Sequence, residues 1–291
     1  MSGGRVHFTG VLSGSGNFAV ASGIQARILA ICTYTGSTTV NTTGAQLYVG
    51  TIPIDGLTGS IAATSGIDVG AGSHLYLYGT AAGQTHTYAG AISGSGTVDI
   101  GGSATGTLIL SGTNTNTGAW SIDSNVVRVT GSIAAGSTLA VGNSAGQGIL
   151  SGDGTVSKTI ELYSGGKIAP GSAGIGTLNT AGITTYTGAI DVELDGTTPT
   201  FDKINSTGTI ALSSNANALT VTSIANSSIG DVYTILEAST AITGTFSGKA
   251  NGSSFMVSGR KLKITYNAKT VTLEDIDPAP PAGSLMMPFF N

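Results

Sequence analysis

The sequence repeats itself, and this repetition constrains the fold more than any other feature. Residues 8–18 (FTGVLSGSGNF) return as residues 88–98 (YAGAISGSGTV), and a shorter copy follows at residues 150–156 (LSGDGTV). Residues 34–40 (YTGSTTV) have a counterpart in residues 116–122 (NTGAWSI), and the copies occur in the same order. Ordered internal repeats are typical of a solenoid, in which one structural unit stacks on the next.

Short strands are expected between the turns. Apolar residues alternate with polar ones in residues 74–78 (HLYLY) and 107–110 (TLIL), and Gly or Ser bounds these segments. Such spacing is compatible with a sandwich, a barrel or a solenoid, and the repeats favour the solenoid. We therefore predict an all-β, parallel β-solenoid domain over residues 1–275, with essentially no α-helix. Seven side chains are expected to stack inside it: Ile92, Val98, Leu108, Leu110, Val127, Val129 and Leu139.

The composition argues against several classes of function. The chain has one Cys, which cannot form an intrachain disulfide, and it contains no CxxC motif or Cys/His cluster. Its 11 Lys and Arg residues form no basic stripe of the kind that nucleic-acid-binding proteins carry. No apolar run approaches the roughly 18 residues of a membrane span. We expect no metal or other cofactor, no nucleic acid and no membrane as partners, and Cys32 as a small buried hydrophobe.

Three segments carry a resemblance to a known family. Residues 88–98, residues 106–118 (GTLILSGTNTNTG) and residues 125–131 (NVVRVTG) resemble, in this order, the autotransporter-associated β-strand repeat of bacterial surface proteins. Asn116 stands where the family usually has Tyr. The resemblance implies a right-handed parallel β-helix over most of the chain.

The chain as given differs from a complete autotransporter. No apolar stretch typical of a signal peptide follows Met1, and no outer-membrane barrel follows the repeats. Among β-helical rods made without a signal, virion proteins are the most familiar. We therefore expect a non-enzymatic structural protein in a bacteriophage virion, either a capsid decoration or head fibre protein or part of a tail fibre or spike. The alternative is a fragment of an adhesin on the bacterial surface that binds host or matrix polysaccharide; a tailspike-type glycanase is a weaker third option.

Residues 276–291 form a separate, Pro-rich C-terminal tail. Four prolines in this stretch disfavour a helix and favour an extended conformation. We expect the tail to dock on another chain, either a neighbouring subunit of a homo-oligomer such as a trimer, or another capsid or tail protein. The alternative is that the tail covers the open end of its own solenoid. The expected docking anchors are Leu285, Met286, Met287, Phe289 and Phe290.

One predicted strand carries three acids. Asp191, Glu193 and Asp195 alternate with apolar residues and therefore project from one face. Such a row, with Asp202 nearby, is compatible with a Ca²⁺ site or a glycosidase pair. We expect instead a solvated strand face, with the apolar residues between the acids pointing inward and no catalytic role.

Two further groups of side chains are candidates for binding. His74, Tyr76 and Tyr78 share one strand face, as do His86 and Tyr88, so either group is compatible with a sugar-binding ledge. We expect these aromatic side chains to cover the outside of the solenoid or to contact another subunit. Residues 260–263 (RKLK) are expected to form a solvated basic face, with an acidic partner as the alternative.

Overall fold

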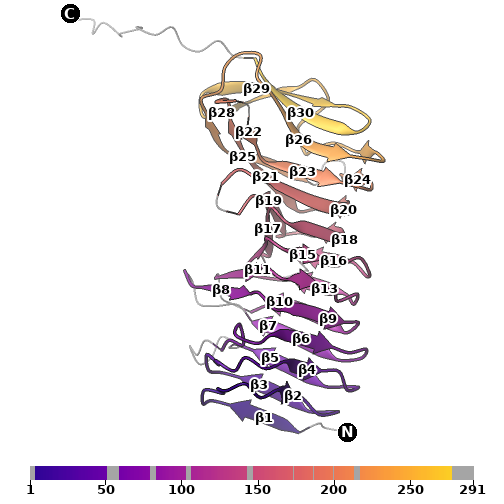
Figure 1. The fold of residues 1–291 in the computed structure, drawn as a ribbon. Helices are drawn as coiled ribbons and strands as arrows, with labels where there is room; N and C mark the ends of the chain where they lie inside the picture. Colours follow the sequence, from indigo (N-terminus) through magenta and orange to yellow (C-terminus); the bar gives the residue numbers. More distant parts are fainter. Residues whose placement is uncertain are drawn as a thin grey trace, which may run out of the picture.

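The computed structural model describes residues 4–50, 59–78, 83–102, 106–142, 147–172, 174–185, 187–198, 200–212 and 217–276. Within these ranges there is no α-helix, and thirty strands form an elongated stack of coils (Figure 1). Strands of successive coils pair in parallel along most of this stack. The prediction of an all-β, parallel β-solenoid is confirmed. The tail beyond residue 276 lies outside the described residues.

Face 1 of the solenoid runs almost its whole length. Its register partners are separated by about one coil: Arg5 pairs with Gln25, and Gln25 pairs with Gln46. In axial order its strands are β1 (Arg5–Phe8), β3 (Gln25–Ile28), β5 (Gln46–Val49), β7 (His74–Tyr78), β10 (Thr97–Gly101), β13 (Trp120–Ile122), β16 (Leu139–Val141), the second halves of β18 (Thr155–Leu162) and β20 (Thr177–Thr185), β24 (Ile210–Ala211) and β27 (Ile242–Thr243).

Faces 2 and 3 complete each coil. The strands of face 2 are β2 (Phe18–Ala19), β4 (Thr38–Val40), β6 (Gly66–Val69), β9 (Ala91–Gly94), β12 (Thr113–Asn114), β15 (Ser132–Ile133), the first halves of β18 and β20, β23 (Lys203–Ser206) and β26 (Val232–Ala238). The strands of face 3 are β8 (Thr85–Tyr88), β11 (Thr107–Leu110), β14 (Val126–Val129), β17 (Ile149–Gly152), β19 (Lys167–Pro170), β21 (Ala189–Asp195), β25 (Ala218–Ala225) and the short antiparallel β22 (Thr200–Phe201).

The core is a column of apolar side chains that fills the inside of the coils. Because successive side chains of a strand point to opposite sides, every second residue enters the column, and the buried and partly exposed residues alternate accordingly. Each fully buried Val, Leu or Ile contributes about 1.5–3 kcal/mol. All of the seven predicted core residues are at most 3% exposed: Ile92, Val98, Leu108, Leu110, Val127, Val129 and Leu139.

The repeated Ser-Gly-Ser-Gly motif, which reads Ser-Gly-Asp-Gly in the third copy, forms a corner, as its composition suggests. The first Gly of each copy has a positive φ, 102° at Gly14, 91° at Gly94 and 114° at Gly152, a conformation that glycine adopts at little cost. The copies do not lie directly above one another, however. Phe18, in the first copy, belongs to β2 on face 2, whereas its counterpart Val98 belongs to β10 on face 1. The motif therefore specifies a local corner that can be used between different faces.

The two ends of the solenoid differ. At the N-terminal end, β1 pairs with β3 and with no other described strand, and Val6 is 42% exposed although its register partner Ala26 is buried. At the C-terminal end, antiparallel strands close the stack: β28 (Ser254–Val257), β29 (Arg260–Tyr266) and β30 (Thr270–Asp275), the last of which also pairs with β26. Within the described ranges, no helix is long and apolar enough to cross a membrane.

Candidate functional site

Three tyrosines from two successive coils form an aromatic ladder on the outer side of face 1. Tyr48 on β5 is the register partner of Tyr76 on β7, and their rings stack with centroids 4.2 Å apart and planes 9° apart. The ring of Tyr78 lies 5.7 Å from that of Tyr48 and is also nearly parallel to it. Paired strands lie about 4.8 Å apart, which brings these partner rings into stacking distance.

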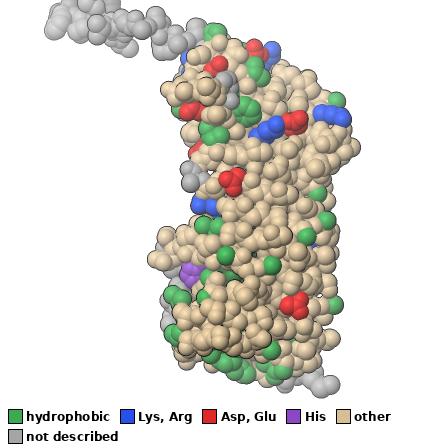
Figure 2. All heavy atoms as spheres, in the orientation of Figure 1, with side chains coloured by type: hydrophobic (Ala, Val, Ile, Leu, Met, Phe, Trp, Pro, Cys, Tyr) green, Lys and Arg blue, Asp and Glu red, His purple; other side chains and the backbone are tan. Residues whose placement is uncertain are grey.

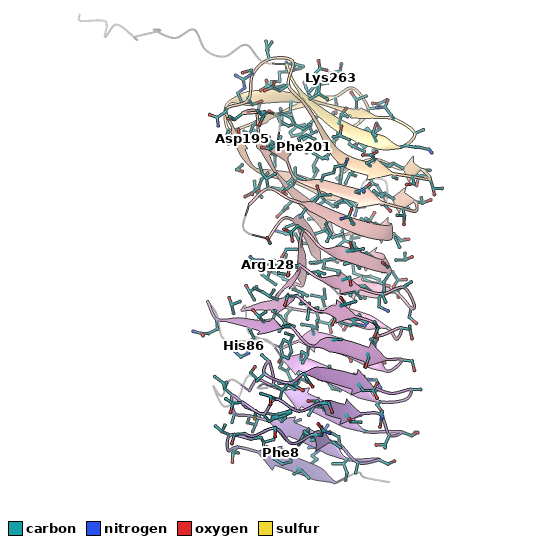
Figure 3. All side chains as sticks on the ribbon, viewed as in Figure 1. Phe8, His86, Arg128, Asp195, Phe201 and Lys263 are labelled. Atoms are coloured by element: carbon teal, nitrogen blue, oxygen red, sulfur yellow. The ribbon has the colours of Figure 1, made fainter. Side chains whose placement is uncertain are left out.

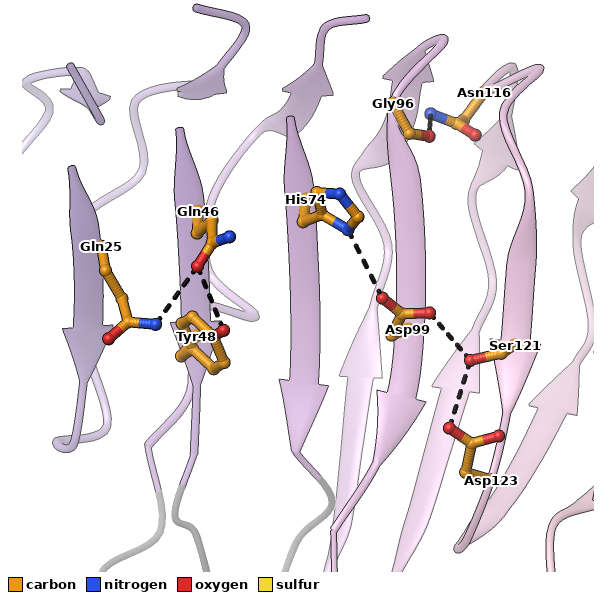
Figure 4. Close-up of polar contacts among 9 residues, drawn as sticks. All are labelled: Gln25, Gln46, Tyr48, His74, Gly96, Asp99, Asn116, Ser121 and Asp123. Atoms are coloured by element: carbon orange, nitrogen blue, oxygen red, sulfur yellow. Dashed lines mark hydrogen bonds and ion pairs between the residues drawn. The ribbon is translucent and has the colours of Figure 1, made fainter. Parts of the chain in front are cut away.

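Polar and charged residues continue the ladder in both directions. The Arg27 guanidinium lies 5.1 Å from the centroid of the Tyr48 ring. His74 stacks beside Tyr76, and its Nδ1 lies 3.8 Å from the Asp99 carboxylate on the next coil. Figure 4 shows three members of this row, Tyr48, His74 and Asp99, on successive coils. The row thus joins four coils through side-chain contacts on the outer surface.

The stacked arrangement bears on what the ladder can bind. Stacked rings cover one another's faces, whereas a sugar would need an open aromatic face. Burial, together with the neighbouring Tyr48, raises the pKa of Tyr76, and burial also raises the pKa of Tyr78. These hydroxyls therefore stay protonated at physiological pH. The ladder is better suited to stiffening the sheet or contacting another chain than to holding a sugar ring. Sequence reasoning missed Tyr48, although the Leu-Tyr pair at residues 47–48 repeats that at residues 75–76.

His86 and Tyr88 share a strand face, as predicted, but this face points inward. Tyr88 is 4% exposed, and His86 is the register partner of Leu108, a core residue. Burial lowers the pKa of His86 and raises the pKa of Tyr88 to about 12. The expectation that this pair covers the outside of the solenoid or contacts another subunit is therefore wrong for Tyr88, and so is the alternative of a sugar-binding ledge at this pair.

On β21 the acids alternate with buried apolar residues, as predicted, but one of the acids is itself buried. Val192 and Leu194 are buried, as expected. Asp191, however, is only 7% exposed, and its Oδ2 lies 2.7 Å from Lys167 Nζ on the preceding coil. The prediction of a solvated face is therefore wrong for Asp191, because the neighbouring coil supplies a cation and covers the carboxylate. Asp195 does lie at the surface, where it accepts a hydrogen bond from the Thr197 N–H.

Asp202 reaches the same region from the segment between β22 and β23. Its Oδ1 accepts a 2.8 Å hydrogen bond from Gly176 N, and its Oδ2 accepts a 2.9 Å bond from Glu193 N. Burial raises the pKa of Asp202 to about 6, and these two bonds partly oppose the rise. The carboxylate thus ties two backbone segments together.

A hollow of about 220 Å³ lies on the outer side of face 3, between Arg128 and these acids. Arg128 is the register partner of Ser151, and Ser151 is the partner of Ala169. On successive coils, the large side chain of Arg128 is therefore followed by the small side chains of Ser151 and Ala169, and these small side chains leave the hollow open. Figure 3 places Arg128 at mid-height on this side of the rod, and Figure 2 shows basic and acidic side chains near one another there.

Two of the residues that line the hollow carry a polar atom that is sealed from solvent. Arg128 Nε and Asp191 Oδ1 are buried and have no hydrogen-bond partner among the described residues. Val126, Ile149 and Pro170 supply apolar walls. In the described part of the chain, no group of three or more His, Cys, Asp or Glu residues is placed to hold a metal ion.

The basic segment near the C-terminal end has acidic partners within the chain. Arg260 Nε lies 2.8 Å from Asp275 Oδ2, and Lys263 Nζ lies 3.5 Å from Glu274 Oε2. The antiparallel pairing of β29 with β30 brings these residues together. Two of the positive charges are therefore balanced without an external partner.

The remaining predicted residues are a cysteine and the tail anchors. Cys32 is buried, as predicted, and its thiol contacts backbone groups of Leu12 and Ala30. The five proposed anchors lie outside the described residues: Leu285, Met286, Met287, Phe289 and Phe290.

Comparison with known proteins adds no assignment to this geometry. No protein-family model matches the sequence, and no curated protein matches it either. The resemblance to the autotransporter-associated repeat stays a prediction.

Proposed function

We propose that the chain is a non-enzymatic structural protein, a rod in a bacteriophage virion that serves as a capsid decoration or head fibre or as part of a tail fibre or spike. The observation that carries this proposal is the parallel strand ladder of face 1, which extends from β1 to β27 over a continuous apolar core. Backbone hydrogen bonds between coils make such a rod stiff along its axis. Stiffness and length are the properties that a fibre or spike needs.

A structural role agrees with the state of the acids on face 3. A glycosidase needs an acid and a base that can both reach the scissile bond. Asp191 is paired with Lys167, and both oxygens of Asp202 accept backbone hydrogen bonds. We expect no release of reducing ends from polysaccharides. Polysaccharide cleavage that disappears in an Asp191→Asn, Glu193→Gln double variant would contradict the non-enzymatic assignment.

The proposed partners are other virion proteins, bound through the tail, and further copies of this chain. Large apolar side chains at residues 285–290 would stabilise such a contact by about 1.5–3 kcal/mol each when buried. Deleting residues 279–291 tests this part of the proposal. We expect loss of assembly, measured by sedimentation, with an unchanged circular dichroism spectrum. Unchanged assembly would contradict docking by the tail.

The location of the protein distinguishes the two candidate functions, a virion protein and an adhesin on the bacterial surface. Antibodies raised against the purified rod should label virions in immunogold electron microscopy and should leave intact bacteria unlabelled. Labelling confined to the bacterial surface would support the second candidate, an adhesin that binds polysaccharide. That candidate is favoured by one observation, the hollow of about 220 Å³ on face 3.

A further inference from the structure

The outer side of face 1 carries a positive charge on one side of the tyrosine ladder and negative charges on the other. Arg27 on β3 precedes the ladder, whereas Asp99 on β10 and Asp123, directly after β13, follow it. Among the described residues, Arg27 forms no ion pair with a carboxylate, and neither acid forms one with a Lys or Arg. Burial and the neighbouring Asp99 raise the pKa of Asp123. The two charged ends are therefore available to a partner.

The register of the strands makes this face self-complementary. β3 and β5 lie two coils and one coil before β7, and β10 and β13 lie one coil and two coils after it. One row of successive register partners runs along the rod: Arg27, Tyr48, Tyr76, Asp99 and Ser121. A two-fold rotation about Tyr76 reverses this row, so that the positive end of one copy lies over the negative end of another.

In such a pair of copies, opposite charges meet and like charges do not. Arg27 faces Ser121 of the second copy. The hydroxyl of Ser121 lies 2.9 Å from Asp99 Oδ1 and 3.4 Å from Asp123 Oδ2, so both acids flank the serine (Figure 4). Tyr48 faces Asp99 of the second copy, and no acid faces another acid.

The positions beside this row also match in size. The same rotation places His74 opposite Tyr78 of the second copy, because both lie on β7 at equal distances from Tyr76. It places Gln46 opposite Gly101, where the absence of a side chain leaves room for the long amide. Tyr and Arg are enriched in the cores of protein interfaces, so the ladder has the composition that such a contact needs.

We propose that face 1 pairs with face 1 of a second copy about a two-fold axis at Tyr76, with the two rods antiparallel. The terminal nitrogens of Arg27 in each copy donate to the carboxylates of Asp99 and Asp123 in the other. Arg27 Nε and Asp123 Oδ1 are sealed from solvent and take no part in this contact. The inference rests on the proposed function in one respect, the expectation that copies of this chain associate.

The size of the contact sets its strength. Five coils spaced at about 4.8 Å and strands of about five residues cover about 24 Å by 16 Å on each copy. Such an area is at the low end of specific interfaces, so we expect a reversible dimer with a dissociation constant on the order of 10–100 μM. Salt should weaken the dimer, because the charges that hold it lie near solvent.

Sedimentation velocity of the full chain at increasing concentration tests the proposal. Arg27→Glu brings an acid opposite Asp123, and Asp123→Arg brings two arginines together, so each variant should associate at least about tenfold more weakly than the wild type. An equimolar mixture of the two variants should restore association. In the mixed dimer the introduced acid meets the introduced arginine, and the native pair forms at the second, symmetry-related contact.

Glu161→Lys is the matched control. Glu161 lies in the same outer row on β18, two coils beyond β13, and its charge reversal should leave association unchanged. Unfolding temperatures within a few degrees of the wild type would confirm that all the variants fold.

Three results would overturn the proposal. The first is equal association of the wild type, both single variants and their mixture, since an oligomer formed by the tail is insensitive to these substitutions. The second is failure of the mixture to associate, which would refute the two-fold register. The third is a wild type that does not associate at all, a result without bearing on the virion location that immunogold labelling tests.

Discussion

Trp120 Nε1 donates a 2.9 Å hydrogen bond to Asn116 Oδ1, and both side chains are almost completely buried. The same oxygen accepts a bond from Gly118 N at 3.0 Å. Asn116 Nδ2 in turn donates to the carbonyl oxygens of Ser93 and Gly96 on the preceding coil. One amide therefore satisfies four buried groups at a corner between two coils.

In the earlier copy of this segment, residues 34–40, the positions of the large and the small side chain are exchanged. There the first residue is Tyr34, whose hydroxyl lies 2.6 Å from Thr38 Oγ1. The backbone bonds are equivalent, since Tyr34 N donates to Leu12 O and Asn116 N donates to Ile92 O. A large residue followed by a small one in the first copy thus becomes a small residue followed by a large one in the second. This exchange explains why Asn116 stands where the earlier copy has Tyr34.

Asn116→Ala should destabilise the rod by more than about 2 kcal/mol, because each buried group left without a partner costs about 1–3 kcal/mol. Urea denaturation measures the change. Thr117→Ala is the matched control, since Thr117 is exposed and its hydroxyl makes only a 3.4 Å contact with Gly94 O. Equal stability of the two variants would show that the Asn116 amide does not hold the corner.

Adjacent residues on β11 should respond oppositely to the same substitution. Leu110 is fully buried, whereas Ile109 points outward and is the register partner of Arg128. Leu110→Asp places an unpaired charge in a dry core and should cost several kcal/mol, about 3–5 or more. Ile109→Asp should leave the unfolding temperature within a few degrees of the wild type. Tolerance of both substitutions would contradict the inward and outward alternation of β11.

The stacked rings of Tyr48 and Tyr76 should be energetically coupled. A double-mutant cycle with Tyr48→Ala and Tyr76→Ala is expected to give a coupling of about 0.5–1.5 kcal/mol, the usual value for aromatic pairs. Tyr163 lies on a distant coil and provides the control, since Tyr48→Ala and Tyr163→Ala should be additive. Additivity of the Tyr48 and Tyr76 substitutions would mean that the stack contributes nothing beyond the area it buries.

The sequence is informative about the coil and much less so about contacts between coils. Period-2 alternation identifies the inward residues, because the side chain of every second residue has to enter the core. It also places Val192 and Leu194 inside, as found. The burial of Asp191 escapes such reasoning, because it depends on Lys167 of the preceding coil. Which residue lies above which depends on coil length, and coil lengths vary: Gln46 pairs with His74, whereas Trp120 pairs with Leu139.

Asn116 and the hollow illustrate the same limit. The exchange of Tyr for Asn is visible in the sequence, but the reason for it lies in Trp120 and in carbonyl groups of another coil. The hollow exists because Ser151 and Ala169 follow Arg128 on successive coils, at separations that no repeat pattern specifies. Sequence reasoning also missed Lys158, a charged residue at one of the inward positions of the alternation along β18.

Lys158 is a fully buried lysine in the core. It lies between Val156 and Ile160 on β18, and its Nζ donates a 2.7 Å hydrogen bond to Gly118 O. Burial lowers its pKa from 10.5 to about 8. Between these two pH values the unfolded chain holds a proton that the folded chain has released, so folding becomes more favourable as the pH rises.

The free energy of unfolding should therefore increase by about 2 kcal/mol between pH 8 and pH 10. Below about pH 8 Lys158 is protonated in both states and contributes no slope. Above about pH 10 the buried tyrosines reverse the trend. Their pKa values are raised in the folded protein, so the tyrosines of the unfolded chain lose their protons first, and the free energy of unfolding falls as the pH rises further. Lys158→Met should flatten the rise and stabilise the rod at pH 7, since an apolar side chain of similar size removes the buried charge. Lys263→Met, which alters a half-exposed ion pair, should retain the rise. Urea denaturation at several pH values measures all three proteins, and an equal slope in wild type and Lys158→Met would show that another group titrates.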